Sequence, residues 1–279
     1  MGDAARAPGA GRLDLLLSAT VTRLHMTGRR VTGADKRLEG EPGAPTVPVA
    51  ARVVIDATEL GDLLPLTGAP FRIGNAVVRG TEQPAKPAHI QDFTWTAVIR
   101  RHPGDTVPGA LRMAAPPPGY DRASFAPAVD NPLPPDSKKP WSWGMFISYR
   151  GMPDSTNPDR TIRNPNANVT RTHVNVAAND VPVTSADLAS PDALRDLERR
   201  LKARTLGLLF HIQQGMTKPA PGWGVADDEG YDTPFNRSRN RELARRHPDL
   251  LPYLPLLDHF PVIPYARESR RIIGMETLR

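Results

Sequence analysis

Residues 51–68, ARVVIDATELGDLLPLTG, give the clearest indication of the fold. The consecutive apolar residues Val53 to Ile55 are typical of a strand that is covered on both faces. They lead into Asp56–Thr58, where small side chains let a ligand approach the backbone closely, as at strand ends that line ligand crevices. On composition alone, an ordinary strand leaving the core through a turn remains the alternative interpretation.

Strand patterns continue on both sides of this stretch. Residues 22–34, TRLHMTGRRVTGA, predict a β-hairpin with its turn at Thr27 and Gly28. Residues 91–99 alternate apolar side chains with polar or small ones, which predicts a half-buried strand. Further strands are predicted at 13–17, 143–149 and 172–176.

One long helix is clear in the second half of the chain. Ser190 is a good N-cap, Pro191 suits the first helical position, and Gly215 marks the end. A shorter helix is predicted over 236–246, whereas the proline-rich segment 102–140 predicts a long excursion over the surface. Strands in the first half and helices in the second indicate an α+β fold.

Composition narrows the class of protein. The chain has 279 residues, 31 of them proline, and no cysteine, which excludes disulfides, thiolate metal sites and cysteine nucleophiles. No apolar run is long enough to span a membrane and no signal peptide is visible, so we expect a cytoplasmic protein with no membrane partner. The net charge is +6, but the arginines of 195–204 alternate with acidic residues as on a solvated helix face, and we expect no nucleic-acid partner.

Motifs for other chemistry are missing from the sequence. The seven histidines show no metal-ligand spacing, so no metal site is predicted. No G-x-S-x-G hydrolase elbow, G-x-x-x-x-G-K-[ST] phosphate loop or G-x-G-x-x-G dinucleotide motif occurs.

Four later segments accompany residues 51–68 in order along the chain. They are the strand at 91–99, RTHVNVAANDVP at 171–182, GWGVADDE at 222–229 and PYARESRRIIG at 264–274. Together the five segments resemble a bacterial family of FAD-dependent oxidoreductases, and the first is similar to its flavin-contacting variant IDAT-x-x-GDL-x-x-x-x-G. The likeness covers about residues 15–279.

The resemblance implies FAD as the cofactor and names candidate residues. The residues implied in cofactor binding are Ala57, Thr58, Gly61 and Asp62. Those implied around the flavin ring and a small-molecule substrate, and taken as catalytic, are Asn175, Asn179, Arg267, Glu268 and Arg270. The resemblance also places Asp180 near the flavin ring or the substrate. Arginine side chains also suit an anionic ligand or the negative charge of a reduced flavin by their own chemistry.

The resemblance further implies a domain plan. It comprises a disordered start at 1–12, a partial FAD-binding domain at 13–68 with a β-meander and returning strand, a strand-and-helix substrate domain at 69–262, and a return toward the FAD domain at 263–279. Relative to the family, we expect an N-terminal FAD-binding segment with its G-x-G-x-x-G unit and a C-terminal closing segment to be missing. The predicted function is hydride transfer from a small organic substrate to flavin, by the enzyme or a central fragment of it. The alternative is a non-catalytic truncated remnant without bound flavin.

Overall fold

The computed structural model describes residues 13–17, 19–38, 45–129, 142–153, 169–267 and 269–273. The chain divides into two compact units. Unit 1 comprises Met1–Phe71, Val78–Glu82 and Arg270–Arg279, and unit 2 comprises Arg72–Val77 and Gln83–Ser269. Helices and small antiparallel sheets occur together, as an α+β fold requires.

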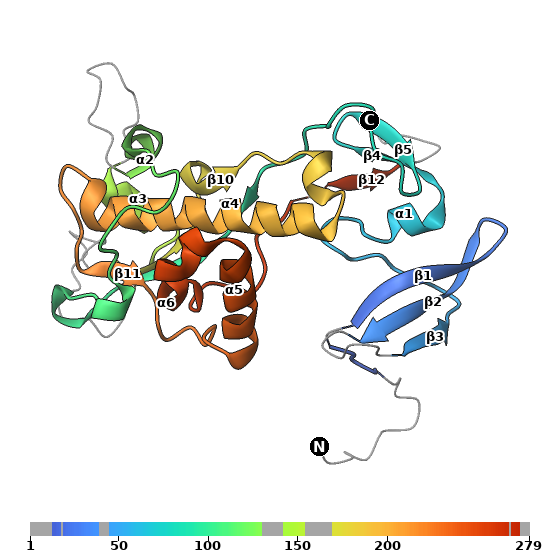
Figure 1. Ribbon diagram of the computed structural model, residues 1–279, viewed down its shortest axis with the longest axis horizontal. Coiled ribbons are helices and arrows are strands. Elements are labelled where there is room, and N and C mark those ends of the chain that lie inside the picture. The colour runs from blue at the N-terminus through green and yellow to red at the C-terminus, as the bar shows by residue number, and fades with distance from the viewer. Residues whose placement is uncertain are drawn as a thin grey trace, which may run out of the picture. The chain divides into compact units, whose positions relative to one another are not determined.

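Unit 1 is built on a three-stranded antiparallel sheet in the order β1 (Ala19–Thr27), β2 (Arg30–Leu38), β3 (Thr46–Ala50) (Figure 1). The hairpin predicted from residues 22–34 is confirmed, but its turn is at Gly28 and Arg29 rather than at Thr27 and Gly28, with Gly28 at φ +59°. A short helix, α1 (Leu64–Thr67), and a strand, β12 (Arg270–Ile272), complete the described part of unit 1 apart from residues of β4 and β5.

The buried strand predicted at residues 51–58 is not present. This segment has no strand structure, and the side chains of Val53 and Ile55 are 74% and 80% exposed. The strand predicted at 13–17 is also wrong, since Leu13 is 87% exposed and unpaired with any described strand. An apolar run forms a buried strand only where another strand pairs with it and other elements cover its faces, and no described strand pairs with residues 51–58.

The centre of unit 2 is a four-stranded antiparallel sheet. Its order is β11 (Trp223–Val225), β7 (Ala97–Arg101), β9 (Val169–Val174), β8 (Met152–Pro153). A second pair of strands, β6 (Phe93–Thr94) and β10 (Asp180–Val181), lies against α4 (Pro191–Phe210). The strand predicted at 91–99 thus forms as β6 and β7, but it is fully buried from residue 93 to 99 rather than half-buried.

Both predicted helices of the second half are confirmed. The Ser190 hydroxyl caps α4 by accepting a hydrogen bond from the backbone N–H of Ala193 at 3.1 Å, and a π-helical turn extends the helix to Gly215. Helix α5 (Pro234–Arg246) begins with an equivalent cap on Thr233. Figure 1 shows α4 as the long helix of unit 2, with α5 and α6 (Leu254–Leu257) nearby.

The segments before α4 differ from their predictions. Residues 143–149 form α3 (Trp143–Tyr149) rather than a strand, because the Ser142 hydroxyl accepts a hydrogen bond from the N–H of Met145 and starts a helix there. The described part of 102–140 includes α2 (Arg122–Val129), whose Phe125 is buried, so it is not only a surface excursion. Remaining elements are β4 (Pro70–Ile73), β5 (Ala76–Arg79) and 3₁₀ turns at Pro103–Asp105, Gly109–Leu111, Ala177–Asn179, Ser185–Leu188 and Pro248–Tyr253.

The sequence predicts a solvated charged face on α4, but part of this face is buried. Glu198 and Lys202 are 5% and 1% exposed, and the Lys202 ammonium donates to Glu198 and to the Asn240 amide oxygen on α5, each at 2.7 Å. The ammonium also lies 4.3 Å from the ring centre of Trp95. A buried ion pair within α4, hydrogen-bonded to Asn240 of α5, therefore takes the place of an apolar contact between the two helices.

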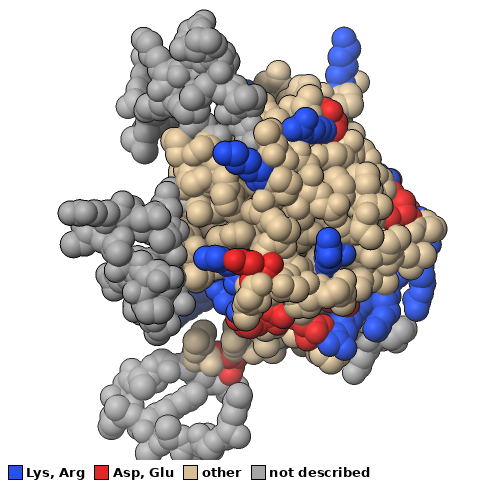
Figure 2. All heavy atoms as spheres, turned by 90° about the vertical axis from the view of Figure 1, so that its left-hand side faces the viewer, with Lys and Arg blue, Asp and Glu red and all other residues tan. Residues whose placement is uncertain are grey.

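Two observations concern the outside of the molecule. In the described part of the chain, no helix combines the length and the apolar character needed to cross a membrane. On the face shown in Figure 2, basic side chains are interspersed with acidic ones and with uncharged surface.

Candidate functional site

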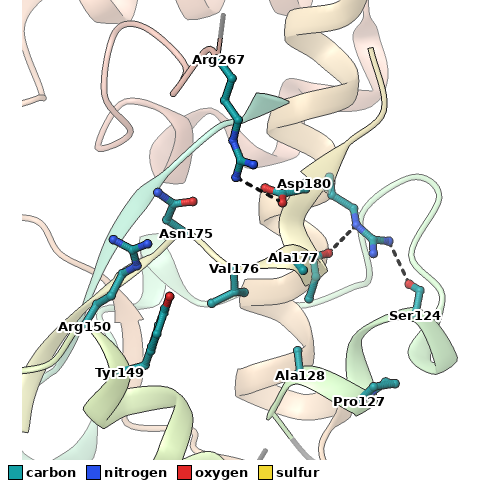
Figure 3. A pocket seen from close by; sticks show the side chains of 12 residues that line it. Ser124, Pro127, Ala128, Tyr149, Arg150, Asn175, Val176, Ala177, Asp180 and Arg267 are labelled. Carbon is teal, nitrogen blue, oxygen red and sulfur yellow. Dashed lines mark hydrogen bonds and ion pairs between the residues drawn. The ribbon is translucent and has the colours of Figure 1, made fainter. Parts of the chain in front are cut away.

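The candidate site is a pocket in unit 2 with a volume of about 630 Å³, within the range usual for small-molecule sites. Its wall is formed by the turn from Asn175 to Asp180, by α2, and by the end of α3 with Arg150. Arg204 of α4 and Arg267 complete it. Figure 3 shows Arg267, Asn175 and Arg150 with polar side chains around the pocket, opposite the small apolar residues Ala128 and Pro127.

Asn179 shapes this pocket without lining it. Its side chain is fully buried, its amide oxygen accepts a hydrogen bond from the N–H of Val176 at 2.9 Å, and its amide nitrogen donates to the carbonyls of Trp95 and Val174. The nitrogen also donates to the Thr205 hydroxyl. Asn179 therefore fixes the turn that presents the backbone of residues 176–178 to the pocket.

Asp180 is the one carboxylate among the described lining residues. It follows the turn on β10, and its carboxylate accepts a hydrogen bond from the Thr94 hydroxyl on β6. Its other oxygen lies 3.6 Å from a guanidinium nitrogen of Arg267. Two neighbouring strands thus hold this carboxylate at the wall of the pocket.

Arg267 has donor capacity that the described residues do not use. Its Nε is buried and has no hydrogen-bond partner in the described structure, and its guanidinium lies 5.7 Å from the ring centre of Tyr265. A buried unpaired donor is costly unless a ligand or water satisfies it.

Arg204 is tied into the protein. Its Nε donates to the carbonyl of Ala178 at 2.7 Å, and another guanidinium nitrogen donates to the Ser124 hydroxyl at 2.9 Å. Its guanidinium stacks 4.1 Å over the ring of Phe125. Burial lowers the pKa of Arg204, while the charge of Asp121 opposes that shift. Arg204 therefore stabilises the wall of the pocket.

Arg150 and Asn175 have fewer interactions with the described residues than the other polar side chains of the pocket. Among the described residues Arg150 has no carboxylate partner, and its guanidinium lies 5.1 Å from the ring centre of Tyr149. Burial lowers the pKa of His173 on β9, and the charge of Arg150 lowers it further. Asn175 is 8% exposed, and its side-chain amide makes no hydrogen bond to another described residue.

In unit 1, the turn that follows residue 55 is held together by hydrogen bonds to the carboxylate of Asp56. Asp56 accepts hydrogen bonds from the N–H and hydroxyl of Thr58 at 3.0 and 2.7 Å, and from the N–H of Leu63 at 3.1 Å. The Thr58 hydroxyl in turn accepts from the N–H of Asp62 at 2.7 Å. Gly61 permits the turn with φ +65°. Most of the donors of this turn are therefore already used.

Arg270 belongs to the same turn in unit 1. Its guanidinium donates to the carbonyl of Leu60 at 3.2 Å and pairs with Asp62 at 3.1 Å. A side chain at Gly61 would lie 3.1 Å from the Arg270 carbonyl, so the two chain segments are in close contact. The arginines of the 264–274 motif thus have different surroundings: Arg267 lines the pocket in unit 2, and Arg270 holds the turn in unit 1.

The sequence-predicted residues therefore fall into separate groups. Asn175 and Arg267 meet at the pocket, and Asn179 supports it from behind. Thr58, Gly61, Asp62 and Arg270 meet in the unit 1 turn, with exposed Ala57 beside them. Glu268 lies outside the described residues.

Sequence reasoning did not select Arg150 or Arg204 as site residues. The resemblance places Asp180 near the flavin ring or the substrate, but Asp180 was not among the residues taken as catalytic. The sequence around Arg150 does not indicate a site residue, because Arg150 reaches the pocket from the end of a helix that was predicted as a strand.

Comparison with known proteins gives one match. A family model described as FAD dependent oxidoreductase matches residues 7–279 of the chain. No curated protein and no solved structure matches it.

A protein that binds FAD must recognise two different parts of it, the polar flavin ring system and the pyrophosphate. The pocket in unit 2 fits the ring, because Arg267 has a buried, unsatisfied Nε and Asn175 has an uncommitted amide at the same wall. The unit 1 turn does not fit the pyrophosphate, since its N–H groups are directed at Asp56 and Thr58. Phosphates bind where several N–H groups converge on one unoccupied point.

Proposed function

Because the chain belongs to the FAD dependent oxidoreductase family, whose cofactor is FAD, we propose that it transfers a hydride from a small organic substrate to that flavin at the unit 2 pocket. The observation that carries the proposal is the uncommitted donor set of that pocket: the Arg267 Nε, the Asn175 amide and the Arg150 guanidinium. Such groups converge where a ligand must be oriented.

The chemistry divides between the cofactor and the chain. When bound, FAD would supply the acceptor for a hydride from a substrate C–H bond. Arg267 would hold the flavin, and its positive charge would favour the electron density added on reduction. Asp180 is placed at the wall to accept the proton that the substrate loses from the neighbouring oxygen or nitrogen. Val176 and Ala177 supply an apolar surface that orients the rest of the substrate.

The supporting residues keep these groups in position. Asn179 fixes the turn that precedes Asp180, and the Thr94 hydroxyl orients the Asp180 carboxylate. Arg204 fastens the same turn to α4 through the Ala178 carbonyl. The unit 1 residues implied in cofactor binding, Ala57, Thr58, Gly61 and Asp62, lie at a turn whose N–H groups are mostly bonded within the turn, so this proposal gives them no direct role in the chemistry.

A second function is favoured by one observation, the closure of the unit 1 turn on Asp56. A chain whose donors do not converge on a pyrophosphate could be a non-catalytic member of the family without bound flavin. The two functions differ in whether flavin bound to this chain can be reduced by a substrate.

The test is anaerobic reduction of bound flavin. The purified chain is mixed with FAD, freed of excess cofactor, and offered a panel of small alcohols, amines and hydroxy acids while the visible absorbance of oxidised flavin is followed. We expect bleaching by at least one substrate, slowed about 100-fold or more in Asp180→Asn, as for loss of a general base.

The matched control is Asp232→Asn, which removes an exposed carboxylate that pairs with Arg237. This variant should bleach at the wild-type rate. Retained flavin that dithionite reduces but no substrate reduces, or an Asp180→Asn rate equal to that of the control, would contradict the proposal. Absence of retained flavin would favour the non-catalytic alternative.

A further inference from the structure

The charges around the unit 2 pocket do not balance. Three guanidinium groups line it, those of Arg150, Arg204 and Arg267, against the single carboxylate of Asp180 among the described lining residues. Arg267 has Asp180 at 3.6 Å. Arg204 has no carboxylate within ion-pair distance among the described residues, but its guanidinium donates to the Ala178 carbonyl and to the Ser124 hydroxyl. Arg150 is therefore the lining arginine to which the described residues give neither an ion pair nor a hydrogen bond.

A hydrogen-bond donor lies beside this charge. The side chain of Asn175 is more than nine-tenths buried, yet its amide is uncommitted among the described residues and lines the pocket. In Figure 3 Asn175 lies between Arg267 and Arg150. A planar guanidinium and an amide N–H together match the two oxygens of a carboxylate.

The rest of the wall is apolar and small. Pro127 and Ala128 come from α2, Val176 and Ala177 from the turn, and the Tyr149 ring stands at the end of α3. Such a surface favours a hydrocarbon or aromatic body over a second charged group. A single uncommitted guanidinium also suits a singly charged anion better than a dianion.

Resting on the proposed function, we infer that the substrate is a monocarboxylate with an apolar body. Its carboxylate binds Arg150 and the amide of Asn175, and its body packs on Val176, Ala177 and the Tyr149 ring. In this arrangement Arg267 remains available to the cofactor, and Asp180 remains available to accept the proton that the substrate loses. Arg150 thus determines which class of substrate binds.

The test uses binding without flavin, so that it does not depend on turnover. Benzoate and its neutral isostere benzamide are titrated calorimetrically into the full chain, with inorganic phosphate as a third probe. We expect benzoate to bind at least about tenfold more tightly than benzamide, a difference of about 1.4 kcal/mol. Phosphate should neither bind nor displace benzoate.

Variants connect the preference to the pocket. Arg150→Gln should abolish the preference for benzoate, and Arg150→Lys should restore part of it, since the charge returns without the planar fork. Arg237→Gln is the matched control, because this arginine is exposed and pairs with Asp232 outside the pocket. It should bind benzoate as the wild type does. Arg150 is itself exposed, so its variants should keep the wild-type circular dichroism.

The outcomes separate the two proposals. Equal binding of benzoate and benzamide, tighter binding of phosphate, or equal loss in the Arg150→Gln and Arg237→Gln variants would overturn the inference, even if flavin is reduced by a neutral substrate. A benzoate preference that depends on Arg150, in a chain whose flavin no substrate reduces, would support the carboxylate site and contradict the oxidoreductase proposal.

Discussion

The two units differ most in what they do with apolar side chains. In unit 1 the buried apolar residues among those described are Leu24, Phe71 and Val78, whereas Leu13, Leu15, Leu17, Val53 and Ile55 are all more than 70% exposed. In unit 2 the interior includes Trp95, Phe125, Leu206, Leu208 and Phe260, each 1% exposed or less.

This difference explains why polar groups have different roles in the two units. Unit 2 has enough packed interior to bury Glu198, Lys202 and Asn179 and to hold a pocket wall in place. Unit 1 instead stabilises its turn with local bonds around Asp56, exposed to water. Buried polar groups require a surrounding core, and local ones do not.

The largest expected effect is at the buried ion pair of unit 2. Glu198→Gln leaves the Lys202 ammonium without its charged partner, and should reduce the free energy of unfolding by about 3–5 kcal/mol. Burial disfavours charged Glu198, but its ion pairs with Lys202 and Arg239 lower its pKa overall, so it is charged at neutral pH. Urea unfolding followed by tryptophan fluorescence reports on unit 2, which holds all 4 tryptophans.

The matched change in unit 1 is Asp35→Asn, which weakens the contact of Asp35 with His25 across β1 and β2. This pair is partly exposed and should contribute less than about 1 kcal/mol. Its fluorescence curve should coincide with that of the wild type. A Glu198→Gln curve that also coincides would show that the buried pair does not stabilise unit 2.

The next effect compares apolar side chains. Leu206→Ala in α4 removes a fully buried side chain and should destabilise the protein by about 2–5 kcal/mol. Ile55→Ala removes a side chain that is 80% exposed and should change stability by less than about 0.5 kcal/mol. Thermal unfolding by circular dichroism measures both. A large loss from Ile55→Ala would mean that the segment is a covered strand after all.

A smaller effect concerns a surface ion pair of unit 2. Arg171 on β9 donates to Asp228 at 2.8 Å, and this hydrogen bond lowers the pKa of Asp228. A lowered pKa in the folded state stabilises the protein above the ordinary aspartate pKa, and that contribution disappears as the pH falls through the folded value. Asp228 is 45% exposed, so screening limits the effect.

Asp228→Asn should therefore cost only about 0.5–1 kcal/mol at neutral pH. The difference in melting temperature between wild type and variant should shrink as the pH falls below the ordinary aspartate pKa of about 3.9, and vanish below the lowered pKa of Asp228 in the folded state. Melting curves recorded from acid to neutral pH measure it. A difference that persists unchanged in acid would assign the effect to something other than the charge of Asp228.

The sequence predicts local features of this fold better than distant ones. The β1–β2 hairpin and the N-terminus of α4 follow from Gly28, Ser190 and Pro191, whose effects act within a few residues. The run at 53–55 misleads because a strand depends on neighbours that the local pattern does not contain. Residues 143–149 are mostly apolar, a pattern that suits a helix or a strand, and the Ser142 cap favours the helix.

The candidate site was predictable in part for the same reason. Asn175 and Arg267 were reached through motifs, and the structure brings them to one pocket. Arg150 was not predictable, since its place there depends on how α3 ends. The division of Arg267 and Arg270 between two units could not be read from their spacing, because a chain can pass from one unit to another within three residues.

In the proposed function, flavin recognition lies with the ring-binding groups of unit 2 and owes little to phosphate contacts in unit 1. Titrating riboflavin and FAD separately into the chain, with flavin fluorescence as the signal, tests this directly. We predict dissociation constants within about tenfold of each other, no competition by ADP, and equal weakening of both in Arg267→Met but not in Arg237→Met. FAD binding more than about 100-fold tighter than riboflavin, with ADP as a competitor, would contradict it and require a pyrophosphate site.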